Sequence, residues 1–266
     1  MSVLAAVAVR FAQGVAMLVV LVGAAWVLID KVPGGPFDRE RELSEEVKAV
    51  LMKRYGLADP LHRRIGTYLL SLAQGDLGPC VSFQDFRVEE VLGQAALPSI
   101  LVGLAALAFA VGLGLPAGVL AASRRGTLWD HTLMAAAVAG LALPNFVVAA
   151  GLILVFGLHL GWLPVAGFDS PRYLILPAIS LGLPFAATFA RLTRASVLET
   201  LSQEYVRTAR AKGMRERDVL FTHALKPALV PVTAYLGPAA AMILTGSVVV
   251  ESIFAVPGLG LHFVNA

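Results

Sequence analysis

The sequence predicts an all-α integral membrane protein with five transmembrane helices, on three observations. Apolar residues make up 58% of the 266 residues and charged residues 15%, whereas soluble proteins average about 45–50% and about 25%. Uncharged runs long enough to span a bilayer recur along the chain, and the short segments between them are alternately rich and poor in Lys and Arg. The mean hydropathy of +0.77 agrees with these patterns. Helices buried in lipid therefore explain the chain better than a soluble fold does.

The first uncharged run covers residues 11–29, between Arg10 and Asp30. A cleaved signal peptide has a shorter apolar core, about 7–15 residues long. We therefore expect residues 1–30 to form the N-terminus and a retained first helix, with the N-terminus in the cytoplasm.

Residues 31–96 change to a polar composition with charges of both signs and several prolines. This composition predicts a small folded extracytoplasmic insert. Within it, a helix from Ser44 to Arg54 begins at a serine cap, and a second helix covers Arg64 to Leu72.

Residues 97–266 are expected to form the membrane core, whose first span is the uncharged run from Ile100 to Ala122. This run ends at Arg124 and Arg125, which places its end in the cytoplasm. The pattern Gly114-x-x-x-Gly118 favours close packing against another helix. A nucleotide-binding role for Gly112-x-Gly114 is excluded, because no strand precedes it and it lies inside an apolar run of lipid-spanning length.

The uncharged region from His131 to Phe168 is too short for two spans and a turn, which need about 40 residues. We expect one helix from about Thr132 to Phe156, with Pro144 and Asn145 inside it. Asn145 could line a polar path beside the proline, or it could be satisfied within a packed bundle.

Two further spans are expected at residues 174–190 and 229–250. Between them lies a polar island, residues 191–226, with eight basic and four acidic side chains. Such a short basic segment belongs on the cytoplasmic side of a membrane. Helix formers precede and follow Gly213, so the island is predicted to fold as helix, break, helix. From charge alone, it could be an ordinary loop that fixes topology, or a rigid knob that a soluble partner grips.

The order of residues in this island resembles a known family. The runs Glu204-Tyr-Val-Arg-Thr-Ala-Arg-Ala-Lys-Gly213 and His223-Ala-Leu-Lys-Pro227-Ala-Leu-Val-Pro231 are similar to the EAA coupling loop of ABC importer permeases of the dipeptide, oligopeptide and nickel branch. Glu251-Ser-Ile-Phe-Ala-Val-Pro-Gly-Leu-Gly260 resembles a second motif of that family, with Ser252 in the place of a threonine. The runs Gly34-Gly-Pro-Phe37 and Gln74-Gly-Asp-Leu-Gly-Pro79 look most like the oligopeptide permease B subunit.

The resemblance implies the roles of particular residues. Contacts with an ATPase subunit fall on Glu204, Arg207, Thr208, Ala209, Lys212, Gly213, Met214, Arg217, Asp218 and Leu220. A translocation path or gate falls on Pro144, Asn145, Glu251, Phe254, Pro257 and Gly258. The family has a sixth helix after the second motif. This chain stops at Ala266, so the resemblance implies that the sixth helix is missing.

The resemblance also implies the partners: a second similar permease, two ABC ATPase subunits that use ATP and Mg, and an extracytoplasmic substrate-binding protein, all at the bacterial inner membrane. The expected cargo is oligopeptides, with dipeptides and nickel chelates as alternatives. This chain has no phosphate-binding loop, so it is expected to bind no ATP or other cofactor and to be a transport subunit without enzymatic activity.

Other functions have little support in the sequence. Cys80 is the only cysteine and the five histidines are scattered, so neither a catalytic nor a metal site is expected. Nucleic-acid binding poorly explains basic residues that flank apolar spans. An ion-driven secondary carrier would place ionisable residues inside its spans. The five expected spans contain none, so energy should come from a partner; a purely structural anchor would not need glycine-rich, kinked helices.

Overall fold

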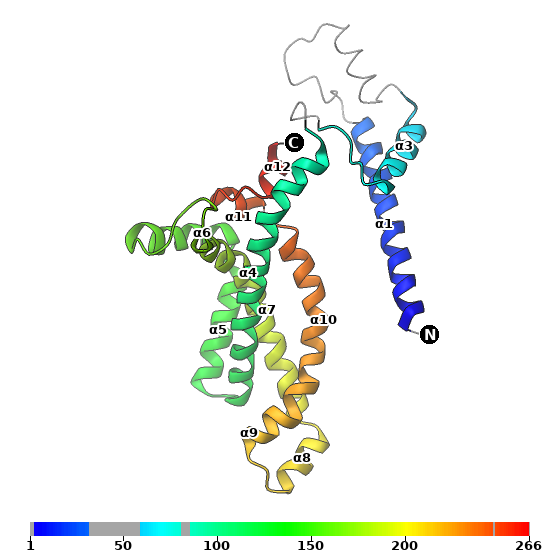
Figure 1. Cartoon of the computed structure of the whole chain (residues 1–266). Helices are drawn as coiled ribbons and strands as arrows, with labels where there is room; N and C mark the ends of the chain where they lie inside the picture. The colour runs from blue at the N-terminus through cyan, green and yellow to red at the C-terminus, as the bar shows by residue number, and fades with distance from the viewer. Residues whose placement is uncertain (1–2, 32–58, 81–85, 247, 266) are drawn as a thin grey trace. The chain divides into compact units, whose positions relative to one another are not determined.

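The computed structural model describes residues 3–31, 59–80, 86–246 and 248–265 (Figure 1). The regular elements in these ranges are helices, apart from an isolated bridge between Pro79 and Arg87. The chain divides into two compact units, Met1–Leu92 and Gly93–Ala266, which are described separately. The predicted all-α class is confirmed.

The first unit contains α1 (Val3–Lys31) and α3 (Leu61–Ala73), which pack against each other. The ring of Trp26 on α1 meets Tyr68 on α3 edge to face at 5.9 Å, and the Arg64 guanidinium lies 5.6 Å from the Trp26 ring centre. Arg64 also pairs with Asp30 at the end of α1. The predicted helix at Arg64–Leu72 is thus confirmed, whereas the one at Ser44–Arg54 lies outside the described residues.

A tight turn before the second span uses two glycines with positive φ, Gly75 at 81° and Gly78 at 88°. These conformations favour glycine because it has no Cβ. Asp76 accepts a hydrogen bond from the N–H of Gly78 and pairs with Arg87. The hydrogen bond from Arg87, helped by that from Gly78, lowers the pKa of Asp76 from its usual 3.8.

The second unit is organised around α7 (Ile175–Leu201), which packs against α5 (Leu128–Ala142) and α10 (Leu225–Leu244). Leu176, Phe189 and Val197 along α7 are completely buried. The Phe189 ring meets Tyr235 of α10 edge to face at 5.2 Å. The predicted span ended at Ala190, but the helix continues to Leu201.

Close contact joins α7 to α4 (Val88–Ser123), through the predicted small residues. A Cβ on Gly114 would lie 2.6 Å from the carbonyl oxygen of Ala186, and one on Gly118 would lie 2.5 Å from that of Ala190. No side chain fits at these distances, so the two backbones touch here as expected for membrane helices. The predicted packing role of Gly114 and Gly118 is confirmed.

The expected single helix from Thr132 to Phe156 is wrong. The chain instead bends by 105° between α5 and a second segment made of α6 (Asn145–Leu152) and the π-helix η1 (Ile153–His159). Leu143 ends α5 in an extended conformation, with ψ at 125°. A residue before proline avoids the helical region, so Pro144 ends one helix and starts the next.

The last predicted span, 229–250, is also corrected. Helix α10 ends at Leu244, and the chain turns at Gly246, whose φ is 82°. Two short helices follow, α11 (Val248–Ile253) and α12 (Leu259–Asn265). A short 3-10 helix, η2 (Pro171–Leu174), precedes α7.

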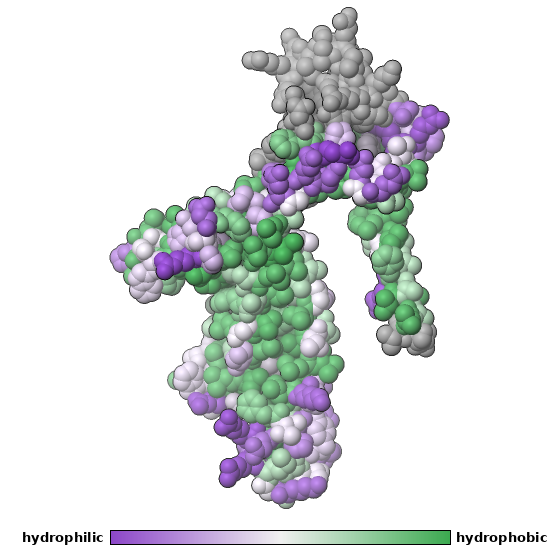
Figure 2. All heavy atoms as spheres, viewed as in Figure 1, coloured by the Kyte–Doolittle hydropathy of each residue, from purple (hydrophilic) through white to green (hydrophobic). Residues whose placement is uncertain are grey.

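Within the described residues, four helices are long and apolar enough to cross a membrane, and the bent pair of α5 with α6–η1 could supply a fifth crossing. Figure 2 shows apolar side chains over the flanks of the second unit and hydrophilic ones gathered at its end near α8 and α9. This distribution is that of a bundle in lipid with one end in water.

Candidate functional site

The end of the second unit carries a compact knob, residues 204–224, formed by α8 (Glu204–Ala211), α9 (Glu216–Asp218) and the π-helix η3 (Val219–Ala224). The turn between α8 and α9 contains Gly213 with φ at 78°, and its N–H donates to the carbonyl oxygen of Arg210. The predicted helix, break and helix at this glycine are confirmed.

A small apolar core gives the knob its shape. Val206 and Ala209 from α8 pack with Val219 from η3, and all three are buried, with Leu201 and Met214 beside them. Across the turn, Arg210 donates to both carboxylate oxygens of Glu216, at 2.8 and 3.2 Å, and to the carbonyl oxygen of Leu201 at 3.3 Å. This ion pair is exposed and contributes little energy; it links the end of α8 to the start of α9.

The residues expected to contact an ATPase subunit divide into two groups. Ala209 and Leu220 are buried and Met214 is half-buried: Ala209 and Met214 belong to the core of the knob, and Leu220 packs against the membrane helices. The other seven are exposed: Glu204, Arg207, Thr208, Lys212, Gly213, Arg217 and Asp218. They form the polar outer surface that a partner could touch.

The knob is joined to the membrane helices by apolar packing. Leu220 and Ala224 of η3 belong to one buried cluster with Ala122 of α4, Val197 of α7 and Ala228 of α10. The knob therefore packs against three helices through one buried cluster, and close-packed side chains transmit strain.

An ion pair that the sequence reasoning missed lies between α5 and α7. The Nε and NH2 groups of Arg194 donate to the two carboxylate oxygens of Asp130, at 2.6 and 2.8 Å. The N–H of Gly126 donates to the same carboxylate at 3.0 Å. The Asp130 side chain is only 2% exposed. In the sequence, Asp130 follows Arg124, Arg125 and Gly126, and an acidic residue so close to a basic turn was the available signal of an ion pair. The sequence did not indicate that its partner is Arg194.

At the opposite end of the second unit, the Glu251 side chain is enclosed. Its carboxylate accepts hydrogen bonds from the Ser99 hydroxyl of α4 at 2.8 Å and from the N–H of Gly260 at 2.6 Å. The Ser99 oxygen accepts in turn from the N–H of Leu259 at 2.9 Å. A Cβ on Gly246 would lie 2.5 Å from the same carboxylate. Gly246, Gly258 and Gly260 thus leave room for the carboxylate, and Gly260 also supplies a backbone donor to it.

The other residues expected at a path or gate lie at two places. Phe254 packs in a core cluster with Val102 of α4 and Leu176 of α7, and its carbonyl accepts from the N–H of Gly167. Gly258 is buried and Pro257 is exposed beside Glu251. Pro144 and Asn145 lie at the bend between α5 and α6, where the Asn145 carbonyl accepts from the Ser180 hydroxyl at 3.0 Å. The structure therefore brings Glu251, Phe254 and Gly258 together, and their role in a gate stays a prediction.

Residues 114–266 match the protein family described as binding-protein-dependent transport system inner membrane component. The chain is 42% identical over 258 residues to the oligopeptide transport system permease protein OppB of Salmonella typhimurium, covering 96% of this chain and 84% of that protein. It is 41% identical over the same length to OppB of Escherichia coli strain K12, with the same coverage. It is 40% identical over 257 residues to the dipeptide transport system permease protein DppB of Bacillus subtilis strain 168, covering 97% and 83%.

Proposed function

The chain belongs to the family of inner membrane components of binding-protein-dependent transport systems, and from this premise we propose that it forms, with a second permease, the path of an ATP-driven peptide importer. Its knob receives the motion of an ATPase subunit. Two such subunits use ATP and Mg, and a binding protein delivers peptide at the other end of the bundle. The chain itself is a transport subunit, not an enzyme.

The packing between the knob and the bundle supports this role most directly. An exposed polar surface on α8 is backed by Val206 and Ala209, which pack on Val219, and η3 continues into α10. Closure of the ATPase subunits on ATP would draw the knobs of the two permeases together and tilt α4, α7 and α10. Hydrolysis would reset the path, which is alternating access.

The orientation proposed for the chain puts the knob in the cytoplasm. Arg124 and Arg125 after α4 and the basic residues of the knob lie at the same end of the second unit, and short basic loops stay in the cytoplasm. Residues 31–96 then lie outside, with the N-terminus inside.

Oligopeptides are the proposed cargo. The relatives named for oligopeptide transport are 41–42% identical to this chain, and those named for dipeptide or di- and tripeptide transport are 40% and 38% identical. Because the difference is small, dipeptides remain the second candidate. Uptake of a labelled pentapeptide in cells carrying the whole system, competed by unlabelled dipeptide or pentapeptide, distinguishes them. Strong competition by the dipeptide alone would contradict the oligopeptide assignment.

The coupling role is tested at Gly213, whose positive φ strains a β-branched residue although a Cβ there would meet nothing within 4 Å. In Gly213→Ile we expect binding-protein-stimulated ATPase activity of the assembled transporter to fall about tenfold, as a backbone penalty of about 1–2 kcal/mol predicts. Membrane insertion and permease assembly should persist, as seen by co-purification.

Gly213→Asn is the matched control, because asparagine adopts this conformation more readily than other side chains. It should keep most of the stimulated activity. Normal stimulation in Gly213→Ile would remove the proposed coupling role, and an equal loss in both variants would show that side-chain volume matters rather than backbone conformation.

A further inference from the structure

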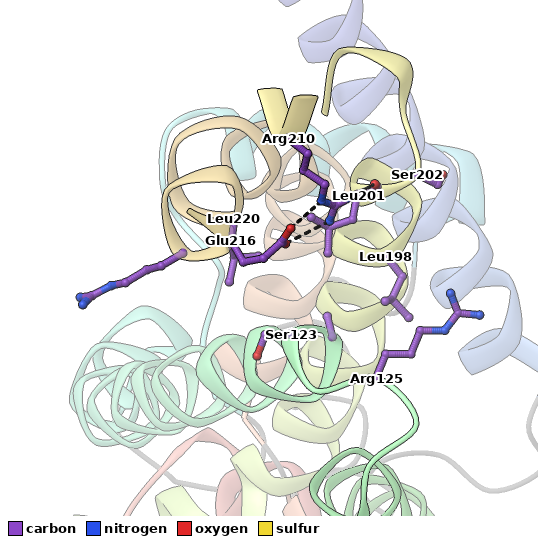
Figure 3. A pocket seen from close by; sticks show the side chains of 10 residues that line it. Ser123, Arg125, Leu198, Leu201, Ser202, Arg210, Glu216 and Leu220 are labelled. Carbon is purple, nitrogen blue, oxygen red and sulfur yellow. Dashed lines mark hydrogen bonds and ion pairs between the residues drawn. The ribbon is translucent and has the colours of Figure 1, made fainter. Parts of the chain in front are cut away.

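A cavity of about 500 Å³ lies beside the contact between the knob and the ends of α4 and α7 (Figure 3). Its walls come from the end of α4, the end of α7 and the knob: Ala122, Ser123, Arg125, Leu198, Leu201, Ser202, Arg210, Glu216, Arg217 and Leu220. The bonded pair of Arg210 and Glu216 crosses one side, and Ser123 of α4 lies on the other. Arg125, Arg210 and Arg217 on its rim are exposed, so a ligand could enter from the surface.

The charge around this cavity is positive. Three arginines line it against one acidic residue, Glu216, which Arg210 already neutralises. Within the described part of the chain, Arg125 and Arg217 form no ion pair. Both side chains are exposed at the rim of the cavity, so its net positive charge suits an anion such as a phosphate group, which a single arginine can bind through a pair of hydrogen bonds.

A second cavity, of about 480 Å³, adjoins the first and shares Ser123 and Leu220 with it. Its other lining residues are all apolar and come from α4, η3 and α10: Leu115, Pro116, Val119, Leu120, Phe221, Leu225 and Leu229. From Leu115 to Ser123 the groove follows α4 for about 12 Å, at 1.5 Å per residue. This length is most of one leaflet, since the hydrocarbon core is about 30 Å thick.

We propose that the two cavities together form a binding site for an anionic phospholipid. The phosphate lies beside Arg125 at the end of α4, and an acyl chain lies in the groove between α4 and α10. A polar, basic cavity continuous with an apolar groove at the end of membrane helices matches the two ends of such a lipid. The assignment to the cytoplasmic leaflet rests on the proposed orientation of the chain.

An ATPase segment is the other occupant to consider, because the knob is proposed to contact that subunit. Apolar residues of the membrane helices α4 and α10 line most of the groove. Phe221 of η3 also lines it and is 54% exposed. An acyl chain fills such a groove without burying polar groups, whereas a soluble protein surface would bury unpaired polar groups in it. The observations therefore favour lipid.

The site is tested by native mass spectrometry of the purified permease pair, released from bilayers of phosphatidylglycerol and phosphatidylcholine in equal amounts. We expect phosphatidylglycerol to be retained preferentially. Arg125→Gln should weaken its retention about fivefold, the loss expected for one basic residue near anionic lipid. Leu120→Trp, which fills the groove, should weaken retention of both lipids.

Arg124→Gln is the matched control. Arg124 carries the same charge one residue away, but its guanidinium lies 5.7 Å from the Trp129 ring centre and does not line the cavity. Retention in Arg124→Gln should equal that of the wild type. Equal losses at both positions would overturn the proposal, because they would indicate only a general positive surface.

Two further outcomes would also overturn it. Competition by glycerol phosphate without acyl chains would show a phosphate site rather than a lipid site. Loss of both lipids to the same extent when ATPase subunits are added would assign the cavity to the contact between the permease and the ATPase subunit. None of these measurements needs ATP or transported peptide, so their failure is distinguishable from failure of the proposed function.

Discussion

At the residue scale, Asp130 and Arg194 form the best-defined polar contact of the second unit. The carboxylate is almost fully enclosed and accepts three hydrogen bonds, two from one guanidinium and one from the Gly126 backbone. Two parallel charge-assisted bonds fix geometry as well as energy. The pair ties the start of α5 to α7, and the Gly126 N–H links the turn after α4 to the same carboxylate.

We expect Arg194→Leu to destabilise the protein by about 3 kcal/mol, because it leaves the Asp130 carboxylate buried without its cation. The Arg194 side chain is 28% exposed, so the lower end of the usual range applies. The double variant Asp130→Leu with Arg194→Leu should recover much of this loss, since no buried charge remains. Thermal unfolding in detergent measures both, and equal losses in the single and double variants would contradict the explanation.

At the scale of elements, the contact between α4 and α7 sets how closely the membrane helices approach. Gly114 and Gly118 lie against carbonyl oxygens of α7, and Gly182 of α7 lies against Ala106 of α4 in the same way. Between lipid-facing helices the hydrophobic effect gives no preference for association, so van der Waals contact of backbones becomes the main attraction.

Gly118→Val should therefore lower the thermal stability, by the about 1–3 kcal/mol typical of overpacking. Gly112→Val is the control on the same helix, because a Cβ there meets nothing within 4 Å. Both variants change helix propensity equally, so only the contact differs. Similar melting temperatures for the two variants would show that the glycine contact contributes nothing.

At the scale of the whole molecule, the positions of the ionisable side chains indicate which source of energy drives transport. The helices are longer than the predicted charge-free spans and carry Asp130 and Arg194, which neutralise each other. The buried Glu251 carboxylate is held by Ser99 and Gly260. An ion-driven carrier needs ionisable groups that bind and release an ion during transport. Both buried carboxylates of the described residues, Asp130 and Glu251, are engaged in bonds between elements, which favours an external energy source.

We therefore expect peptide uptake by the reconstituted transporter to need ATP and to persist when ionophores collapse proton and sodium gradients. Liposomes that contain the permease pair, the ATPase subunits and the binding protein provide the measurement, with omission of nucleotide as the control. Uptake under an imposed ion gradient without nucleotide would contradict the proposed mechanism.

The sequence by itself determined the all-α membrane class, the approximate positions of the spans, the packing glycines of α4 and the turn at Gly213. Each depends on local chemistry: an uncharged run of sufficient length, a small residue at helical spacing, or a glycine among helix formers. Residues close in sequence carry all the information that these features need.

Only the tertiary structure decided the rest. The 105° bend at Pro144, the pairing of Asp130 with Arg194 and the enclosure of Glu251 by Ser99 depend on which helices meet. A proline in a membrane helix can kink it or end it, depending on which neighbouring groups satisfy the freed backbone. Likewise, a carboxylate is buried only where the fold supplies donors, here from residues 64 and 152 positions away.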